Sequence, residues 1–345
     1  MKDLKYLSAL SIPLAAAISI YFKGHWSYFT PVYAFIVIPF LELLMPLDTD
    51  NLTAEQLDKK SNSPVFDWML YLNIPIVFGF LIYTLWDIST HTYAVYEIVG
   101  LVLSVGIVLG VNGINVGHEL GHRQQSIERY FGKLLLLPSF YMHFYIEHNF
   151  GHHANAATHE DPATAKYNQS VYSFWFTSVF GQYFSAWKLQ SQILNRSKLS
   201  FLNPKNDMFW YLILQSLYLL TVYYFFGLSG MYFALAVGVV GFLLLETVNY
   251  IEHYGLIRKK LPSGRYERVQ ESHSWNSNHV IGRIILYELT RHSDHHYKSA
   301  KKYQLLDCHD TSPQMPYGYP TSMVLSFFPP IWFRIMNPRI PEEMK

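Results

Sequence analysis

Six apolar segments, each about long enough to cross a lipid bilayer, constrain the fold of this chain more than any other feature. Only 15% of the residues are charged, which is far fewer than a soluble protein usually carries. The sequence therefore predicts an all-α membrane protein with six transmembrane helices. These spans are expected over residues 4–21, 28–47, 68–86, 94–117, 208–226 and 231–251.

The basic residues divide very unequally between the two sides that six crossings create. One side receives 25 of the 26 Lys and Arg residues, and the other receives only Lys23. Because cytoplasmic loops carry an excess of Lys and Arg, the crowded side is predicted to be cytoplasmic, with both termini on it. That side also holds residues 118–207 and 252–345. We expect them to form a helical cytoplasmic cap on a single domain that spans residues 1–345.

Several stretches on this side are too short or too interrupted to count as spans. Residues 134–146 are apolar but contain Pro138, so we expect a re-entrant or buried segment. Residues 171–187 are rich in aromatic side chains and suit a helix that lies at the membrane interface. Residues 323–336 should pack at the surface or against the bilayer, and the acidic residues 48–67 are read as a solvated connection.

Histidines are concentrated in four short segments, all on the predicted cytoplasmic side. Three imidazoles within six residues, as in Glu147–His153, are poor packing material, because they repel when protonated and need partners for both nitrogens when neutral. A bound cation resolves both problems, since neutral imidazole is the commonest metal ligand. The candidate ligands are His118, His122, His148, His152, His153, His253, His292, His295 and His296.

Nine imidazoles exceed what one ion takes, which is about four to six ligands, so they indicate a dimetal site. Imidazole suits Zn, Cu, Fe and Ni, and the ligand chemistry alone does not choose among them. A carboxylate or amide behind each imidazole would be needed to orient its ring N–H. Candidates for this role are Glu119, Glu147, Asp161, Asn249, Glu252, Glu288 and Asp294.

Polar side chains also approach two of the histidine segments from within the expected spans. Asn115 lies three residues before His118, and Glu246 and Asn249 lie seven and four residues before His253. Polar groups at this depth are costly unless they face a protein interior or a cavity, so they favour a buried site. The fourth span also has small residues at close spacing, which predict tight helix packing. They are Gly106, Gly110, Gly113 and Gly117.

Seven further histidines lie outside these segments. His25 and His91 fall on the opposite side of the membrane and are not expected to be ligands. The others are read as structural or solvent-exposed, with His159 and His279 the least certain because their surroundings are polar and turn-like. The remaining three are His143, His273 and His309.

The histidine segments resemble the three histidine boxes of the membrane fatty-acid desaturases and hydroxylases. The narrower resemblance is to the integral-membrane alkane 1-monooxygenases, through Asn249-Tyr-Ile-Glu-His-Tyr-Gly-Leu256 and Leu289-Thr-Arg-His-Ser-Asp-His-His296. Glu160-Asp-Pro162 and Trp275-Asn-Ser-Asn-His279 are similar as well. The resemblance covers about residues 70–335. Thr290 stands where the family pattern has Gln, which puts little in doubt because this position is not a ligand.

This resemblance implies a bacterial inner-membrane enzyme with two non-haem irons held by the nine histidines. The enzyme would use O2 to hydroxylate the terminal methyl of a medium-chain alkane, which enters from the bilayer. Electrons would come from rubredoxin, which would dock on the cytoplasmic face. An NAD(P)H-dependent rubredoxin reductase would in turn reduce the rubredoxin. The rubredoxin must be a separate protein, because one cysteine, Cys308, cannot ligate iron through four thiolates.

Three alternatives remain open from the sequence. One is a xylene-type methyl hydroxylase, and another is a membrane lipid desaturase or hydroxylase, which should need a polar docking surface for the head group. The third is a membrane metal transporter or sensor. Transport sites typically lie near the bilayer midplane on broken helices, whereas these histidines collect at one face. The near-zero net charge of +1 also argues against a nucleic-acid partner.

Overall fold

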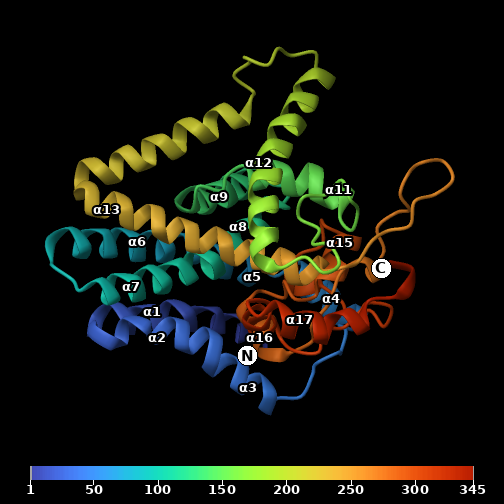
Figure 1. Ribbon diagram of the computed structural model, residues 1–345, viewed down its shortest axis with the longest axis horizontal. Coiled ribbons are helices and arrows are strands. Elements are labelled where there is room, and N and C mark those ends of the chain that lie inside the picture. The colour runs from blue at the N-terminus through green and yellow to red at the C-terminus, as the bar shows by residue number, and fades with distance from the viewer. Residues whose placement is uncertain (1, 345) are drawn as a thin grey trace.

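The computed structural model describes residues 2–344, which fold into helices joined by turns and loops (Figure 1). Five of its helices are long and apolar enough to cross a membrane. They overlap the stretches in which spans were predicted, and the last helix covers two of those stretches. The all-α prediction is therefore confirmed. The five helices cover Asp3–Phe22, Gly24–Leu44, Val65–Thr90, Val95–Gly121 and Asp207–His253.

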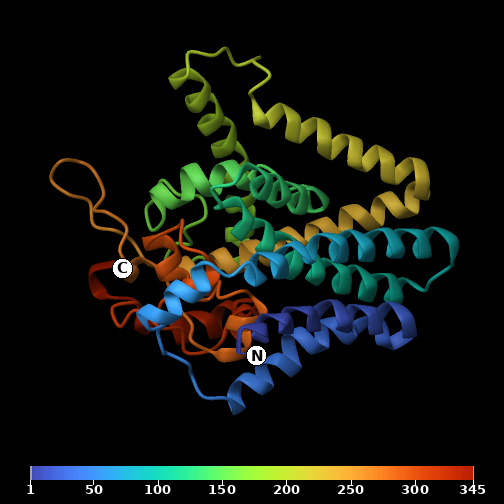
Figure 2. The ribbon, with the colours of Figure 1, turned by 180° about the vertical axis from the view of Figure 1, so that it is seen from behind.

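The long helices run side by side, as Figure 2 shows for α1, α6 and α7, and shorter helices gather at one end. The first half of the chain contains α1 (Ser11–Phe22), α2 (Phe29–Val32), α3 (Ile38–Leu44), α4 (Ala54–Ser61), α5 (Val65–Tyr71), α6 (Asn73–Thr90), α7 (Val95–Val108), α8 (Asn115–Gly121) and α9 (Ser126–Leu136). The second half contains α10 (Phe144–Glu147), α11 (His153–Asn155), α12 (Val171–Arg196), α13 (Asp207–His253), α14 (Val280–Ile285), α15 (His292–Tyr297), α16 (Tyr319–Ser326) and α17 (Pro329–Met336).

Helix α13 is a hairpin of two helices. It has 47 residues, and its backbone leaves the helical region at Gly227, where φ is 66° and ψ is −166°. A straight helix of that length would extend about 70 Å, more than twice the thickness of a bilayer core. Glycine can adopt the positive φ that the turn requires. Figure 1 shows the chain folding back on itself here, between the fifth and sixth predicted spans.

The glycines of the fourth span pack closely against two different partners. A Cβ on Gly106 would lie 2.4 Å from Val240 of α13. Farther along, a Cβ on Gly117 would lie 3.0 Å from the carbonyl oxygen of Gly132 in α9. Small residues let helix backbones approach this closely. The predicted close packing is therefore confirmed, and it fixes the helix that carries His118 between α9 and α13.

Three π-helical segments interrupt the α-helices, and each contributes to the wall of one internal cavity. They are η3 (Tyr33–Val37), η4 (Leu109–Ile114) and η6 (His148–His152). A π-helical turn contains an extra residue and often occurs at a functional site. The buried segment predicted over residues 134–146 is confirmed. Its backbone adopts the left-handed conformation at Phe140, whose φ is 55°, and Tyr141 is almost completely buried.

Candidate metal centre

The nine predicted histidines come together at one end of the helical bundle. Their ring nitrogens form two groups, within each of which the candidate ligand atoms all lie within 4.8 Å of one another. The first group contains His118, His122, His148, His153 and His295. The second contains His152, His253, His292 and His296. The groups are adjacent, since the ring centroids of His153 and His296 are 4.6 Å apart.

The nitrogens within each group point toward a common centre. In the first group, the Nε2 atom of His118 lies 2.8 Å from that of His148, 3.1 Å from that of His295 and 3.2 Å from that of His122. In the second group, the Nε2 atoms of His253 and His292 are 3.1 Å apart. When two imidazoles bind one ion at right angles, and each bond from nitrogen to the ion is about 2.1 Å long, the two nitrogens lie about 3 Å apart. The observed spacings therefore fit metal coordination.

Hydrogen bonding among the imidazoles cannot account for this arrangement. A neutral imidazole has one donor and one acceptor nitrogen, so the Nε2 of His118 cannot satisfy three neighbouring nitrogens at once. In the second group, the Nε2 atoms of His152 and His296 are buried and have no hydrogen-bond partner among residues 2–344. Buried polar groups in folded proteins are nearly always paired. These unpaired nitrogens fit a bound ion, so the residues suit a metal site.

A π-helical turn determines how the histidines of the second segment are divided. In an α-helix, His148 and His152 would lie on one face, as four-residue spacing predicts. The chain is π-helical over His148–His152. In a π-helical turn, residues five positions apart lie on the same face. His148 and His153 consequently join the first group, while His152 joins the second. The sequence indicated the three ligands but not this division.

Burial keeps His148, His292 and His295 neutral in the absence of metal. Desolvation lowers the pKa of His295 to about 4, and it holds the pKa values of His148 and His292 well below the usual value. Neighbouring imidazoles act in the same direction for His148 and His292, because two positive charges would repel. A neutral imidazole is the form that binds a cation, so the site is prepared for ligation.

Two of the predicted carboxylate partners lie directly behind histidines, and both belong to the second group. Asp161 accepts a hydrogen bond from Nδ1 of His152 at 2.9 Å and another from the hydroxyl of Thr164 at 2.6 Å. An oxygen of Glu252 lies 3.3 Å from Nδ1 of His292. The hydrogen bond to Asp161 fixes the orientation of the His152 ring and raises its basicity. The second group is thus flanked by two carboxylates.

The other carboxylate and amide candidates contact different partners. Glu119 pairs with Arg123 and accepts from the backbone of Tyr303, and Asp294 pairs with Lys301. Helix α15 begins only at His292, so Glu288 does not share its helical face. Glu288 instead bonds to Arg283, Tyr6 and Lys5. Glu147 accepts a hydrogen bond from the hydroxyl of Ser185 at 3.4 Å, and Asn249 donates one to Glu246 at 3.4 Å.

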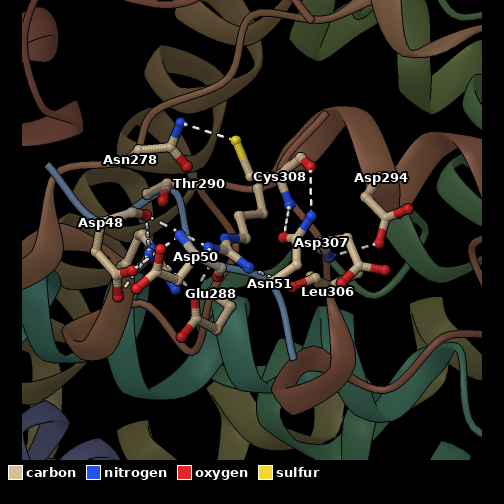
Figure 3. A network of polar contacts seen from close by, with 12 residues as sticks. Asp48, Asp50, Asn51, Asn278, Glu288, Thr290, Asp294, Leu306, Asp307 and Cys308 are labelled. Carbon is tan, nitrogen blue, oxygen red and sulfur yellow. Dashed lines mark hydrogen bonds and ion pairs between the residues drawn. The ribbon is translucent and has the colours of Figure 1, made fainter. Parts of the chain in front are cut away.

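Arg291, the residue before His292, anchors the histidine segment His292–His296 from behind. Its guanidinium donates to the carbonyl oxygen of Leu306 at 2.7 Å, of Asp50 at 2.9 Å and of Asp48 at 3.3 Å. Figure 3 shows this part of the acidic stretch lying against the segment around Leu306. These acidic residues are largely exposed, as a solvated connection would be, and the backbone carbonyls of Asp48 and Asp50 also satisfy the buried guanidinium of Arg291.

Cys308 lies in the same network, and we expect its replacement to be nearly silent. Its Sγ accepts a weak hydrogen bond from Asn278 at 3.3 Å. Asn51 accepts a hydrogen bond from the backbone N–H of Cys308 at 2.7 Å and donates one to the carbonyl oxygen of Cys308 at 2.9 Å. The backbone contacts survive in Cys308→Ser. Stability should change by about 0.5 kcal/mol or less, and the activity that the family resemblance implies should stay within about twofold of the parent, measured by thermal unfolding and product formation. A large loss would contradict this structural interpretation.

An apolar cavity leads from the membrane-crossing helices to the histidines. It has an empty volume of about 890 Å³ and reaches His118 and His148 of the first group and His292 of the second. Residues from α1, η3, η4, α13, α14 and α16 line it. The apolar lining includes Ile12, Phe35, Ile38, Ile107, Leu244, Val248, Ile285 and Met323. Its polar lining residues besides the histidines are Asn115, Asn249, Glu252 and Tyr319.

The histidines outside the two groups take ordinary roles. His159 is exposed, and His279 contacts Ser277. His309 pairs with Asp294 at 2.8 Å. His143 is buried, and burial lowers its pKa to about 3. Sequence reasoning missed Tyr319 as a lining residue and Arg291 as an anchor, and no pattern in their neighbourhoods marked them.

Comparison with known proteins identifies the class of this membrane protein. A family model described as fatty acid desaturase matches residues 94–325, which include all nine histidines. The match covers more than half of the chain, so the chain belongs to the fatty acid desaturase family of membrane enzymes.

The similar curated proteins are narrower in function. An alkane 1-monooxygenase of Pseudomonas aeruginosa is 36% identical over 338 residues, covering 97% of this chain and 90% of that protein. Another, from Alcanivorax borkumensis, is 39% identical over 307 residues, covering 89% and 76%. The hydroxylase component of a xylene/toluene monooxygenase of Pseudomonas putida is 26% identical over 346 residues, covering 97% and 88%. The chain is thus a membrane oxidoreductase of the alkane monooxygenase kind.

Proposed function

We propose that this protein hydroxylates the terminal methyl group of medium-chain alkanes to 1-alkanols, using O2 and two irons held by the nine histidines. The single observation that carries the proposal is the apolar cavity ending on His118, His148 and His292, which belong to both histidine groups. The relatives named alkane 1-monooxygenase support the substrate class. Iron is the metal that the family resemblance implies, and imidazole ligands suit it.

The cavity wall would select the position of attack by shape. An alkane has no polar handle, so side chains such as Phe35, Leu244 and Val248 can only confine it sideways and guide it end-on. The terminal methyl is then the part that reaches the histidines. The bound irons would supply the reduction and cleavage of dioxygen, and the protein positions the substrate and excludes water. Overall, O2, two electrons and two protons convert the alkane into an alcohol and water.

A separate rubredoxin would deliver the electrons at the outer edge of the first histidine group. His122 and His153 are half-buried, whereas the other seven candidate ligands are buried. Their rings lie 4.8 Å apart, so they form one edge of the centre that approaches the surface. A donor docked there would be nearer to the centre than one docked elsewhere on the cap. We also propose that rubredoxin reductase and NAD(P)H complete the chain of electron transfer.

We further propose a single domain with six crossings, in the inner membrane, whose cap and termini face the cytoplasm. The break in α13 at Gly227 supports counting that helix as two spans. The distribution of Lys and Arg supports the orientation. Both labelled termini lie toward the end where the cap helices α15, α16 and α17 gather (Figure 1), which agrees with an even number of crossings.

Product analysis with competing substrates tests this proposal. The purified, iron-loaded protein would receive rubredoxin, its reductase and NADH, with octane and p-xylene together. We expect octan-1-ol as the main product. A methylbenzyl alcohol without octanol would instead assign the enzyme to the xylene-type branch, which the 26% identical relative represents. Formation of neither product in a sample verified to hold two irons would overturn both and direct attention to acyl lipids.

A further inference from the structure

A second cavity, with no histidine in its lining, lies between α9, α12 and the beginning of α13. It has an empty volume of about 770 Å³. One part of its wall is cationic, formed by Arg129, Lys133 and Lys205, and another is apolar, including Ile146 and Phe150. The alkane cavity has no cation in its lining. The two cavities therefore suit different molecules, and the second suits one with both an anionic and an apolar part.

The cationic charge of this cavity is only partly neutralised. Lys133 pairs with Asp207, the only acidic lining residue, at 2.6 Å. Arg129 donates only to neutral oxygens, the backbone carbonyls of Arg123 and Gln124 and the hydroxyl of Ser126. The ammonium group of Lys205 is exposed and makes no contact among the described residues. A net charge of about +2 is therefore left to attract an anion.

The surroundings place this cavity at the surface of the membrane. In Figure 1, α12 runs across the direction of α6, α7 and α13. A helix in that orientation lies along the membrane surface, as the aromatic composition of residues 171–187 predicted. Most of its exposed positions follow a four-residue spacing that is aromatic in the first turns and polar or cationic in the last turns. The exposed residues at this spacing are Tyr172, Phe176, Phe180, Phe184, Lys188, Gln192 and Arg196, and Ser173, Thr177 and Asn195 are exposed beside them.

The chain around the cavity is also free of acidic residues over a long stretch. Residues 163–206, which include all of α12 and the loop to α13, contain five Lys or Arg and no Asp or Glu. Clusters of basic residues beside a membrane attract anionic lipids, with about 1 kcal/mol for each Lys or Arg near the surface. The exposed aromatic side chains of α12 can enter the same leaflet. The basic residues and the exposed aromatic side chains thus both favour the same kind of occupant, an anionic lipid.

We propose that this cavity binds the phosphate head group of an anionic membrane lipid. The phosphate would lie between Arg129 and Lys205, with Lys133 at the base of the cavity beside Tyr145, whose ring centroid is 4.4 Å from its ammonium nitrogen. The acyl chains would leave past the exposed Tyr130 and Phe150. Such a lipid would join α9, which packs against the helix of His118 and His122, to α12 and α13.

The test compares lipid retention by the full-length parent and a matched pair of variants. Each protein is extracted from membranes containing equal amounts of phosphatidylglycerol and phosphatidylcholine, and the lipids that remain bound are counted by native mass spectrometry. We expect the parent to be enriched in phosphatidylglycerol and Lys205→Ala to reduce that enrichment about fivefold. Lys59→Ala, at an exposed lysine of α4 outside the cavity, should leave it unchanged.

Several results would overturn the proposal. One is equal retention of phosphatidylglycerol and phosphatidylcholine by the parent. Another is an equal loss of phosphatidylglycerol enrichment in Lys205→Ala and Lys59→Ala. Displacement of the lipid by excess inorganic phosphate, but not by sulfate, would identify a site for free phosphate. A dimer of the parent that dissociates in Lys205→Ala would show that a second copy of the chain covers this surface.

Discussion

Replacing His295 with alanine is expected to reduce alkane hydroxylation to below about 1% of the parent while leaving the protein inserted in the membrane. Loss of a residue that merely orients a ligand typically costs about 10–100-fold in metal affinity or activity, and His295 is predicted to be a ligand itself. Its Nε2 lies 3.1 Å from that of His118, in the group of five. Iron content should therefore fall from about two to about one per chain, measured by elemental analysis.

The control for this substitution is His159→Ala, which removes the same side chain from an exposed position of the cap outside both groups. Its iron content and activity should match those of the parent. The ligand assignment fails if His295→Ala retains two irons and normal turnover. It also fails if His159→Ala loses iron to the same extent. His148→Ala should behave as His295→Ala does, because the Nε2 atom of His148 lies 2.8 Å from that of His118.

The helical fold and the nine histidines could be predicted because their signals are local. An apolar run of about 20 residues is visible without knowledge of its neighbours. Histidines at four-residue spacing indicate a ligand pair in the same way. Even the turn within α13 was visible, because the expected spans ended at residue 226 and resumed at residue 231, on either side of Gly227.

The division of the histidines and the roles of several carboxylates could not be predicted, because they depend on contacts between distant segments. The π-helical turn that separates His152 from His148 and His153 leaves no mark in residue spacing. Glu288 was a candidate partner of the histidines, and it lies four residues before His292, a spacing that would put both on one helical face. In the structure, Arg283, Lys5 and Tyr6 hold the carboxylate of Glu288, and two of these residues come from the opposite end of the chain.

The close approach of α8 and α9 leads to the second large expected effect, the loss of folded protein in Gly132→Ala. A Cβ at this position would lie 2.7 Å from the carbonyl oxygen of Gly117 and 3.0 Å from the backbone nitrogen of Gly121. Both contacts are with backbone, so no side chain can rotate away. Inserting atoms into a well-packed core costs about 1–3 kcal/mol. The yield of folded protein and its thermal unfolding temperature should both fall.

Iron content distinguishes a general loss of stability from a local displacement of the metal site. Gly117 and Gly121 flank His118 in α8, so moving this helix away from α9 also moves His118 and His122 out of the first group. The Gly132→Ala protein that does fold should therefore hold less iron than the parent.

Gly79→Ala in α6 is the matched control, because a Cβ there meets nothing within 4 Å. Its stability should be unchanged or slightly higher, since alanine favours helix more than glycine does. Normal iron binding and stability in Gly132→Ala would mean that α8 and α9 can separate without cost, and that their packing does not position the first pair of histidines.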